Sequence, residues 1–171
     1  MTSVRKSRTP LLLAGAALLL LAGIGVVLIP TETRTNGTVE IYGEKTSSEQ
    51  PGDLLCAFEL VDGTHDFTDI ECLNDEAEFF KLVNAPSATV ISFHDSPKCE
   101  DKADQNFYMY LKTVKKNVTF EKPLELRVVI ETPVDDVIQG SGGVRMEKKL
   151  QNGQVHGKLS CVKIKRSAVP D

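Results

Sequence analysis

The sequence lacks the short motifs that mark the common catalytic and metal-binding sites. Its cysteines form no Cys-x-x-Cys pair, which argues against a thiol oxidoreductase and against a zinc knuckle. The glycine-rich segment 140–143 is not followed by the Gly-Lys-Ser/Thr of a phosphate loop, so it predicts a hairpin connection. His65, His94 and His156 follow no ligand spacing and are expected at the surface or in turns. We therefore expect a protein that is not an enzyme and that holds no metal or cofactor.

A nucleophile elbow is missing as well. Catalysis by a triad needs a nucleophile, a base and an orienting acid in contact with one another. Ser and Asp residues lie near His94 in the sequence. A hydrolase site formed by their convergence in space is the least favoured alternative.

Acidic residues are absent from the N-terminal part of the chain. None precedes Glu32, whereas Arg5, Lys6 and Arg8 are basic. Residues 11–29 are apolar or small without interruption, and a proline follows at position 30. About twenty apolar residues suffice to cross the hydrocarbon core as a helix, and the basic flank is expected in the cytoplasm. The pattern predicts a basic cytoplasmic leader at 1–10 and one transmembrane or signal helix at 11–30.

Two interpretations of segment 11–30 remain open. A cleaved signal peptide has an apolar region of about 7–15 residues followed by small residues at the cut site. Here the apolar run is longer, and no Ala-x-Ala follows it. We favour a single-pass anchor in the bacterial inner membrane with the rest of the chain in the periplasm, and a cleaved, secreted form is the alternative. No cysteine closes the apolar run, which argues against a lipoprotein.

The part of the chain beyond the apolar run is acidic. The chain has 20 basic and 24 acidic residues, of which the first thirty positions hold three basic and no acidic ones. Residues 31–171 thus carry 17 basic and 24 acidic residues, a net charge of −7. An acidic domain repels nucleic acid and anionic lipid surfaces, so neither is expected as a ligand. A cationic partner would be attracted to it.

The exported part contains four cysteines, Cys56, Cys72, Cys99 and Cys161. An even number in an oxidising compartment predicts two disulfides, and four cysteines allow three pairings. We favour Cys56–Cys72, which closes a short loop between adjacent strands. The second bond is then Cys99–Cys161, which ties a loop in the middle of the chain to the last strand.

The exported part is predicted to be all-β, a small disulfide-braced antiparallel β-sandwich. Residues 31–53 are polar and predict a stalk, in which 39–42 can form a short strand. The sandwich is expected at 54–166, followed by a C-terminal tail at 167–171. Turn signals separate short strands with alternating apolar residues. The expected strands are 54–60, 79–83, 89–93, 107–114, 124–130, 144–150 and 159–164, with 124–130 the clearest, and the one helical candidate is 74–81.

Acidic residues gather around one cysteine. Asp95, Glu100, Asp101 and Asp104 flank Cys99. Oxygen ligands at this density can hold calcium, but their spacing does not match an EF-hand loop. We favour a solvated loop pinned by a disulfide and take the four acids as a candidate interaction surface.

Two tyrosines give a second candidate contact. Tyr108 and Tyr110 alternate with apolar residues of the same expected strand and precede three lysines at 112–116. Tyrosine favours interfaces. The alternative is a charged edge that discourages association between sheets.

From Cys72 to Ile164 the sequence resembles the βγ-crystallin-like sandwiches of small secreted bacterial proteins. The resemblance rests on 74–77 (Asn-Asp-Glu-Ala), 90–97 (Val-Ile-Ser-Phe-His-Asp-Ser-Pro) and 157–164 (Gly-Lys-Leu-Ser-Cys-Val-Lys-Ile). It implies relatives that bind calcium or inhibit secreted enzymes. Asn74-Asp75 would supply the first half of the family's calcium motif. Glu78 and Phe79 replace the second half, so calcium is not expected at this site.

These observations favour a non-enzymatic periplasmic binding module. Its most concrete form is an inhibitor or immunity protein that neutralises an exported or incoming enzyme, with a basic toxic or lytic enzyme as the expected protein partner. It would cover an active site with a loop. The alternative is a structural or stress-related envelope protein that binds calcium or an envelope component.

Overall fold

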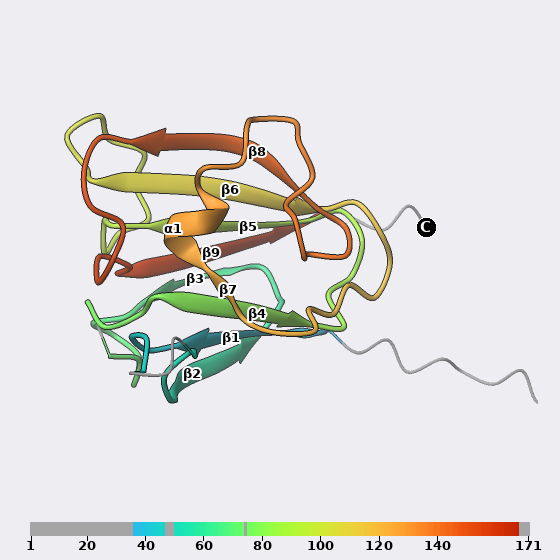
Figure 1. Ribbon diagram of the computed structural model, residues 1–171, viewed down its shortest axis with the longest axis horizontal. Helices are drawn as coiled ribbons and strands as arrows, with labels where there is room; N and C mark the ends of the chain where they lie inside the picture. Colours follow the sequence, from blue (N-terminus) through green and yellow to red (C-terminus); the bar gives the residue numbers. More distant parts are fainter. Residues whose placement is uncertain (1–35, 47–49, 74, 168–171) are drawn as a thin grey trace, which may run out of the picture. The chain divides into compact units, whose positions relative to one another are not determined.

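The computed structural model describes residues 36–46, 50–73 and 75–167 (Figure 1). The predicted leader at 1–10, the membrane segment at 11–30 and residues 168–171 of the predicted tail lie outside these ranges. Within the described ranges, no helix has both the length and the apolar character needed to cross a membrane.

The described chain forms two antiparallel sheets, which Figure 1 shows as two layers. The first sheet has the strand order β2-β1-β4-β7, and the second has the order β3-β9-β5-β6-β8. The first comprises β1 (Thr38–Tyr42), β2 (Leu54–Glu59), β4 (Phe79–Val83) and β7 (Leu124–Glu125). The second comprises β3 (Gly63–Asp66), β5 (Thr89–His94), β6 (Phe107–Thr113), β8 (Val144–Gln151) and β9 (Cys161–Arg166). The predicted all-β antiparallel fold is confirmed.

Apolar residues from both sheets form a single core. Phe107, Met109 and Leu111 of β6 are fully buried, while the side chains between them in sequence point to the other face of the sheet. Phe80 of the first sheet packs on Phe93 of the second, with ring centroids 4.6 Å apart. The period of two along the strands therefore defines an inner face, which packs in the core, and an outer face of each sheet.

Both predicted disulfides are present. Cys56 of β2 pairs with Cys72, 16 residues further on, and Cys99 pairs with Cys161 of β9 across 62 residues. The chain-entropy model gives the shorter cross-link about 3 kcal/mol and the longer one about 4 kcal/mol.

The short strand predicted at 39–42, within segment 31–53, is present as part of β1. Strand β1 lies inside this segment and occupies an interior position of the first sheet, between β2 and β4. Val39 and Ile41 are fully buried. Because alternate residues of β1 are apolar, this strand contributes to the core, and the sandwich begins before residue 54.

The prediction of a strand at 124–130 is wrong beyond its second residue. Strand β7 ends at Glu125, and a single helical turn, α1 (Leu126–Val129), follows it. Leu126, Val129 and Ile130 are buried, whereas Val128 is 59% exposed. The buried residues have the i, i+3, i+4 spacing of a helical face. The strand prediction rested on Leu126, Val128 and Ile130 at a period of two, but Val129 rather than Val128 is buried, which is the helical pattern.

Three further segments differ from the prediction. The helix expected at 74–81 is absent from its described part, because residues 79–83 form β4 and Asp75 has a φ of 61°. Segment 63–66, for which no strand was predicted, forms β3 and pairs with β9. The last strand begins at Cys161 rather than at residue 159, and both of its faces are buried at that end.

Candidate functional site

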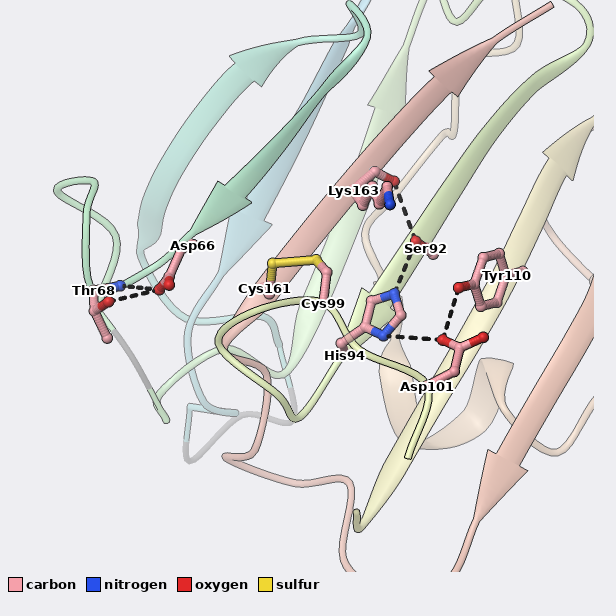
Figure 2. Close-up of a disulfide and its surroundings, with 9 residues drawn as sticks. All are labelled: Asp66, Thr68, Ser92, His94, Cys99, Asp101, Tyr110, Cys161 and Lys163. Carbon is pink, nitrogen blue, oxygen red and sulfur yellow. Dashed lines mark hydrogen bonds and ion pairs between the residues drawn. A yellow bond between two sulfur atoms is a disulfide. The ribbon is translucent and has the colours of Figure 1, made fainter. Parts of the chain in front are cut away.

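The loop 95–106 joins β5 to β6 and lies against the outer face of the second sheet (Figure 2). The disulfide from Cys99 to Cys161 fixes it to the start of β9. Most of the candidate residues predicted from the sequence lie in this loop, which we call the braced loop, and on the strands beneath it.

The strand register gathers polar side chains under the braced loop. Ser92 of β5 lies opposite Tyr110 of β6 on one side and Lys163 of β9 on the other. His94 lies opposite Tyr108 and Cys161 in the same way. Directly opposed residues share a face of the sheet, so these side chains lie side by side on the outer face.

His94 is fully buried beneath the braced loop, so the expectation of a surface histidine is wrong. Its Nε2 lies 2.9 Å from Ser92 Oγ, and its Nδ1 lies 3.6 Å from Asp101 Oδ1. Burial lowers the pKa of His94 to about 4, Lys163 and Lys148 lower it as well, and Asp101 opposes this. The neutral imidazole is the ordinary state near pH 7.

Asp101 anchors the braced loop to two strands. Its carboxylate accepts a hydrogen bond of 2.7 Å from the Tyr110 hydroxyl and one of 2.6 Å from the Lys148 ammonium. Burial favours a higher pKa for Asp101, but the bonds from Lys148 and Tyr110 outweigh it and lower the pKa. Lys148 also lies over the rings of Tyr108 and Tyr110, 5.0 and 5.4 Å from their centroids. The two tyrosines predicted as a contact therefore belong to the same cluster as Asp101.

The other acids of the predicted interaction surface have two different environments. Asp95 accepts hydrogen bonds of 3.0 Å from both the backbone N–H and the side-chain amide of Asn106, which closes the base of the loop. Glu100 pairs with Lys102 at 2.6 Å, and Asp104 is exposed. Two of the four predicted acids hold the loop in place, and the other two, Glu100 and Asp104, face solvent. Among the described residues, these acids do not converge on one point as ligands of an ion.

The contacts from Ser92 to His94 and from His94 to Asp101 have the order of a catalytic triad. Figure 2 shows these three residues beside the disulfide. Ser92 is only 2% exposed, and its hydroxyl lies 3.4 Å from the carbonyl oxygen of Lys163. A nucleophile must reach a substrate carbonyl, and this hydroxyl is enclosed by protein. The local signal for the contact is the spacing Ser-x-His within one strand. Asp101 reaches it from the braced loop, which the disulfide fixes to the start of β9.

The outer face of the second sheet is basic, because Lys112 of the predicted lysine group at 112–116 is joined there by lysines of β9. Lys112 and Lys165 lie opposite Val90 on its two sides, and Lys163 lies one row further along. Lys163 and Lys165 are exposed, and Lys112 is half-buried. The lysines come from two strands far apart in sequence, so only the register brings them together. A positive sheet face thus borders the braced loop, whose solvent-facing acids Glu100 and Asp104 lie beside Lys98 and Lys102.

The chain matches no protein-family model, no curated protein and no solved structure among those with which we compared it. The resemblance to βγ-crystallin-like proteins stays a prediction.

Proposed function

We propose that the chain is a non-enzymatic binding module, held by segment 11–30 in the bacterial inner membrane with its sandwich domain in the periplasm. It acts as an inhibitor or immunity protein against an exported or incoming enzyme. Two disulfides are typical of an oxidising compartment, which supports this location. The braced loop and the neighbouring strands are the contact surface.

The observation that carries the proposal is the threefold attachment of the braced loop. Hydrogen bonds from Asn106 to Asp95 close its base, the disulfide pins Cys99, and Asp101 binds Tyr110 and Lys148. A loop held in one conformation loses little entropy when it binds. This is the property that an inhibitor needs when it covers an active site.

The charges of this region suggest the chemistry of the partner surface. Glu100 and Asp104 give the loop tip two solvent-facing carboxylates, of which Glu100 is paired with Lys102, and these carboxylates suit a basic active-site cleft. Lys163 and Lys165 of the adjacent sheet face suit an acidic rim around that cleft. The net negative charge of the domain would speed its encounter with a basic enzyme.

The environment of the Ser92–His94 pair supports a non-enzymatic role. A general base works best with a pKa near the operating pH, and burial lowers the pKa of His94 to about 4. The enclosed Ser92 hydroxyl has no open path to a substrate. In our proposal this pair fills the space under the loop and supports it.

A capture experiment with matched charge changes tests the proposal. The full-length protein, immobilised from detergent, is incubated with envelope and secreted fractions, and any retained enzyme is assayed for activity. We expect an enzyme at one-to-one stoichiometry whose activity falls on binding. The variant E100K/D104K should lose it. The control E131K/D136K makes the same charge change at exposed sites after α1 and should retain it.

The experiment tests the contact surface and the inhibitor function separately. Equal capture by both variants would remove the loop tip from the interface. An enzyme that binds but stays fully active, or no stoichiometric enzyme at all, would overturn the inhibitor function.

A further inference from the structure

A second cluster of chemically active side chains lies away from the braced loop. Glu44 follows β1, Glu78 precedes β4, and His156 lies between β8 and β9. Each offers one ligand atom, and the three atoms lie within 4.8 Å of one another. The residues are far apart in sequence, so no spacing motif predicts their convergence.

The backbone places Glu78 and His156 against each other. The Glu78 N–H donates to the Tyr42 carbonyl at 3.0 Å, and the Glu78 carbonyl accepts from the Leu126 N–H at 2.8 Å. Gly157 has a φ of +59°, and a Cβ there would lie 2.9 Å from the Asp75 carbonyl oxygen. Only glycine adopts this conformation so close to another backbone at low cost. The turn that carries His156 can therefore lie directly on the segment that leads to Glu78.

The Glu78 carboxylate is buried and incompletely bonded. Its side chain is 3% exposed, and its Oε2 accepts a hydrogen bond of 3.2 Å from the Lys45 backbone N–H. Its Oε1 is buried and has no hydrogen bond in the described structure. The imidazole Nε2 of His156 touches this oxygen without forming a hydrogen bond of normal geometry. A buried carboxylate oxygen requires a donor or a cation, because its desolvation is otherwise uncompensated.

The neighbouring cations pair with a different carboxylate. The Lys45 ammonium lies 3.1 Å from Glu125, and the Arg127 Nε lies 3.0 Å from the same carboxylate. Burial favours a higher pKa for Glu125, but hydrogen bonds from Lys45 and Arg127 lower it. Glu125 is thus the acid that these two side chains neutralise, and Glu78 Oε1 is left facing His156 and Glu44.

We infer that Glu44, Glu78 and His156 bind a divalent transition-metal ion, with Zn²⁺ as the best match. Zinc accepts one imidazole and two carboxylates, whereas an imidazole ligand disfavours Ca²⁺ and Mg²⁺. Zinc–ligand distances of about 2.0–2.2 Å bring ligand atoms to about 3.3 Å from one another. Glu44 and His156 are exposed and can adjust their distances from Glu78 by changing rotamer, His156 by moving slightly away, while the buried Glu78 stays fixed. Three protein ligands leave one position open to water or to a group from another molecule.

The test uses full-length protein without a histidine tag, stripped with a chelator. Zinc is titrated by calorimetry, and the thermal midpoint is measured with and without the ion. We expect one site per chain, a rise in the midpoint that chelator reverses, and no comparable effect of Ca²⁺ or Mg²⁺. The variants H156A and E44A change exposed side chains and should weaken zinc binding at least about tenfold.

A neighbouring acid outside the proposed zinc site provides a matched control. Glu76 is an exposed acid two residues from Glu78, and E76A should bind zinc as the wild type does. No saturable binding, or binding that H156A and E44A leave unchanged, overturns the inference. In that case the His156–Glu78 contact is an ion pair only. Calcium binding that persists in H156A would show a carboxylate site and would also overturn the zinc assignment.

Discussion

The buried imidazole of His94 lies 3.6 Å from the carboxylate of Asp101. In the sequence, His94 precedes the disulfide-bonded Cys99 and Asp101 follows it. His94 ends β5, while Asp101 belongs to the braced loop. Ser92, Tyr110 and Lys148 complete the contacts of this pair. The protonation state of His94 and the carboxylate of Asp101 therefore contribute to the stability of the loop, beside the disulfide and the hydrogen bonds between Asp95 and Asn106.

Acidification should destabilise the domain through His94. Its pKa is about 4 in the folded protein and 6.5 in a model peptide, so the unfolded chain binds more protons between these values. The contribution of the neutral His94 to the free energy of unfolding is fully present above pH 6.5. It is lost as the pH falls toward 4, with a loss on the order of 3 kcal/mol. Urea unfolding at pH 7.5, 5.5 and 4 would measure it.

The variant H94Q isolates this effect, because glutamine is polar but does not titrate. Its free energy of unfolding should fall less steeply than that of the wild type between pH 6.5 and 4. Asp101 has a lowered pKa, so its own contribution is lost only below its ordinary value of 3.8. Of the other charged or titratable groups near His94, the lysines Lys148 and Lys163 and the two tyrosines keep their charge state over this range. Parallel pH profiles for the two proteins would contradict the assignment to His94.

Replacing Asp101 by asparagine should loosen the braced loop. The variant keeps the size of the side chain but loses the charge that binds Lys148 and Tyr110. We expect a loss of about 1–3 kcal/mol in the free energy of unfolding, because hydrogen bonds to a charged group are the stronger class. Amide hydrogen exchange should accelerate in 95–106 and stay unchanged in β1. The control E100Q breaks the exposed pair with Lys102 and should leave both measurements at the wild-type values.

The two disulfides should differ in their contribution to stability. Removal of Cys99–Cys161 by the double variant C99A/C161A should cost about 4 kcal/mol, and C56A/C72A about 3 kcal/mol, since the longer closed loop restricts the unfolded chain more. Denaturant unfolding compares the two. The larger loss should be accompanied by faster exchange in the braced loop. If the two variants lose equal stability and amide exchange in the braced loop does not change, Asp95 and Asp101 suffice to hold the loop.

Much of the sandwich could be predicted from the sequence because alternation of apolar residues reports burial directly. Strands β4, β6 and β8 lie close to their predicted positions, and the favoured pairing of the cysteines, one of three that the sequence allowed, is confirmed. Segment 124–130 shows the limit of this signal. Its apolar residues fit both a period of two and a helical turn, and the burial of Val129 together with the exposure of Val128 decides between them.

The candidate site could be predicted only where it is local in sequence. The acids around Cys99 are neighbours in the chain and were found. The burial of His94 depends on a disulfide partner 62 residues away and on the register of three strands. The basic sheet face and the contact of Glu78 with His156 arise in the same way from distant segments. Such contacts carry no spacing signal, because the fold brings the residues together.

The predicted membrane segment at 11–30 has a direct test. Full-length protein should stay in the membrane fraction after a carbonate or high-salt wash, because its apolar run is long enough to span the bilayer. The same chain with two lysines inserted at the centre of the run should lose this property, since charged residues there oppose insertion. A shortened protein in the soluble periplasm would show instead that the segment is a cleaved signal.

The salt dependence of binding tests whether the acidic loop tip guides the partner enzyme. Attraction between the loop and a basic enzyme should speed association, and salt screens it over about 10 Å at 0.1 M. With the partner in hand, the association rate should fall as salt rises, and E100A/D104A should show a lower rate and a weaker dependence on salt. These two acids face solvent and do not hold the loop, so the change leaves the brace intact. The variant K163A/K165A, on the adjacent sheet face, serves as the comparison. If only K163A/K165A alters the two rate constants, the basic sheet face rather than the loop tip makes the contact.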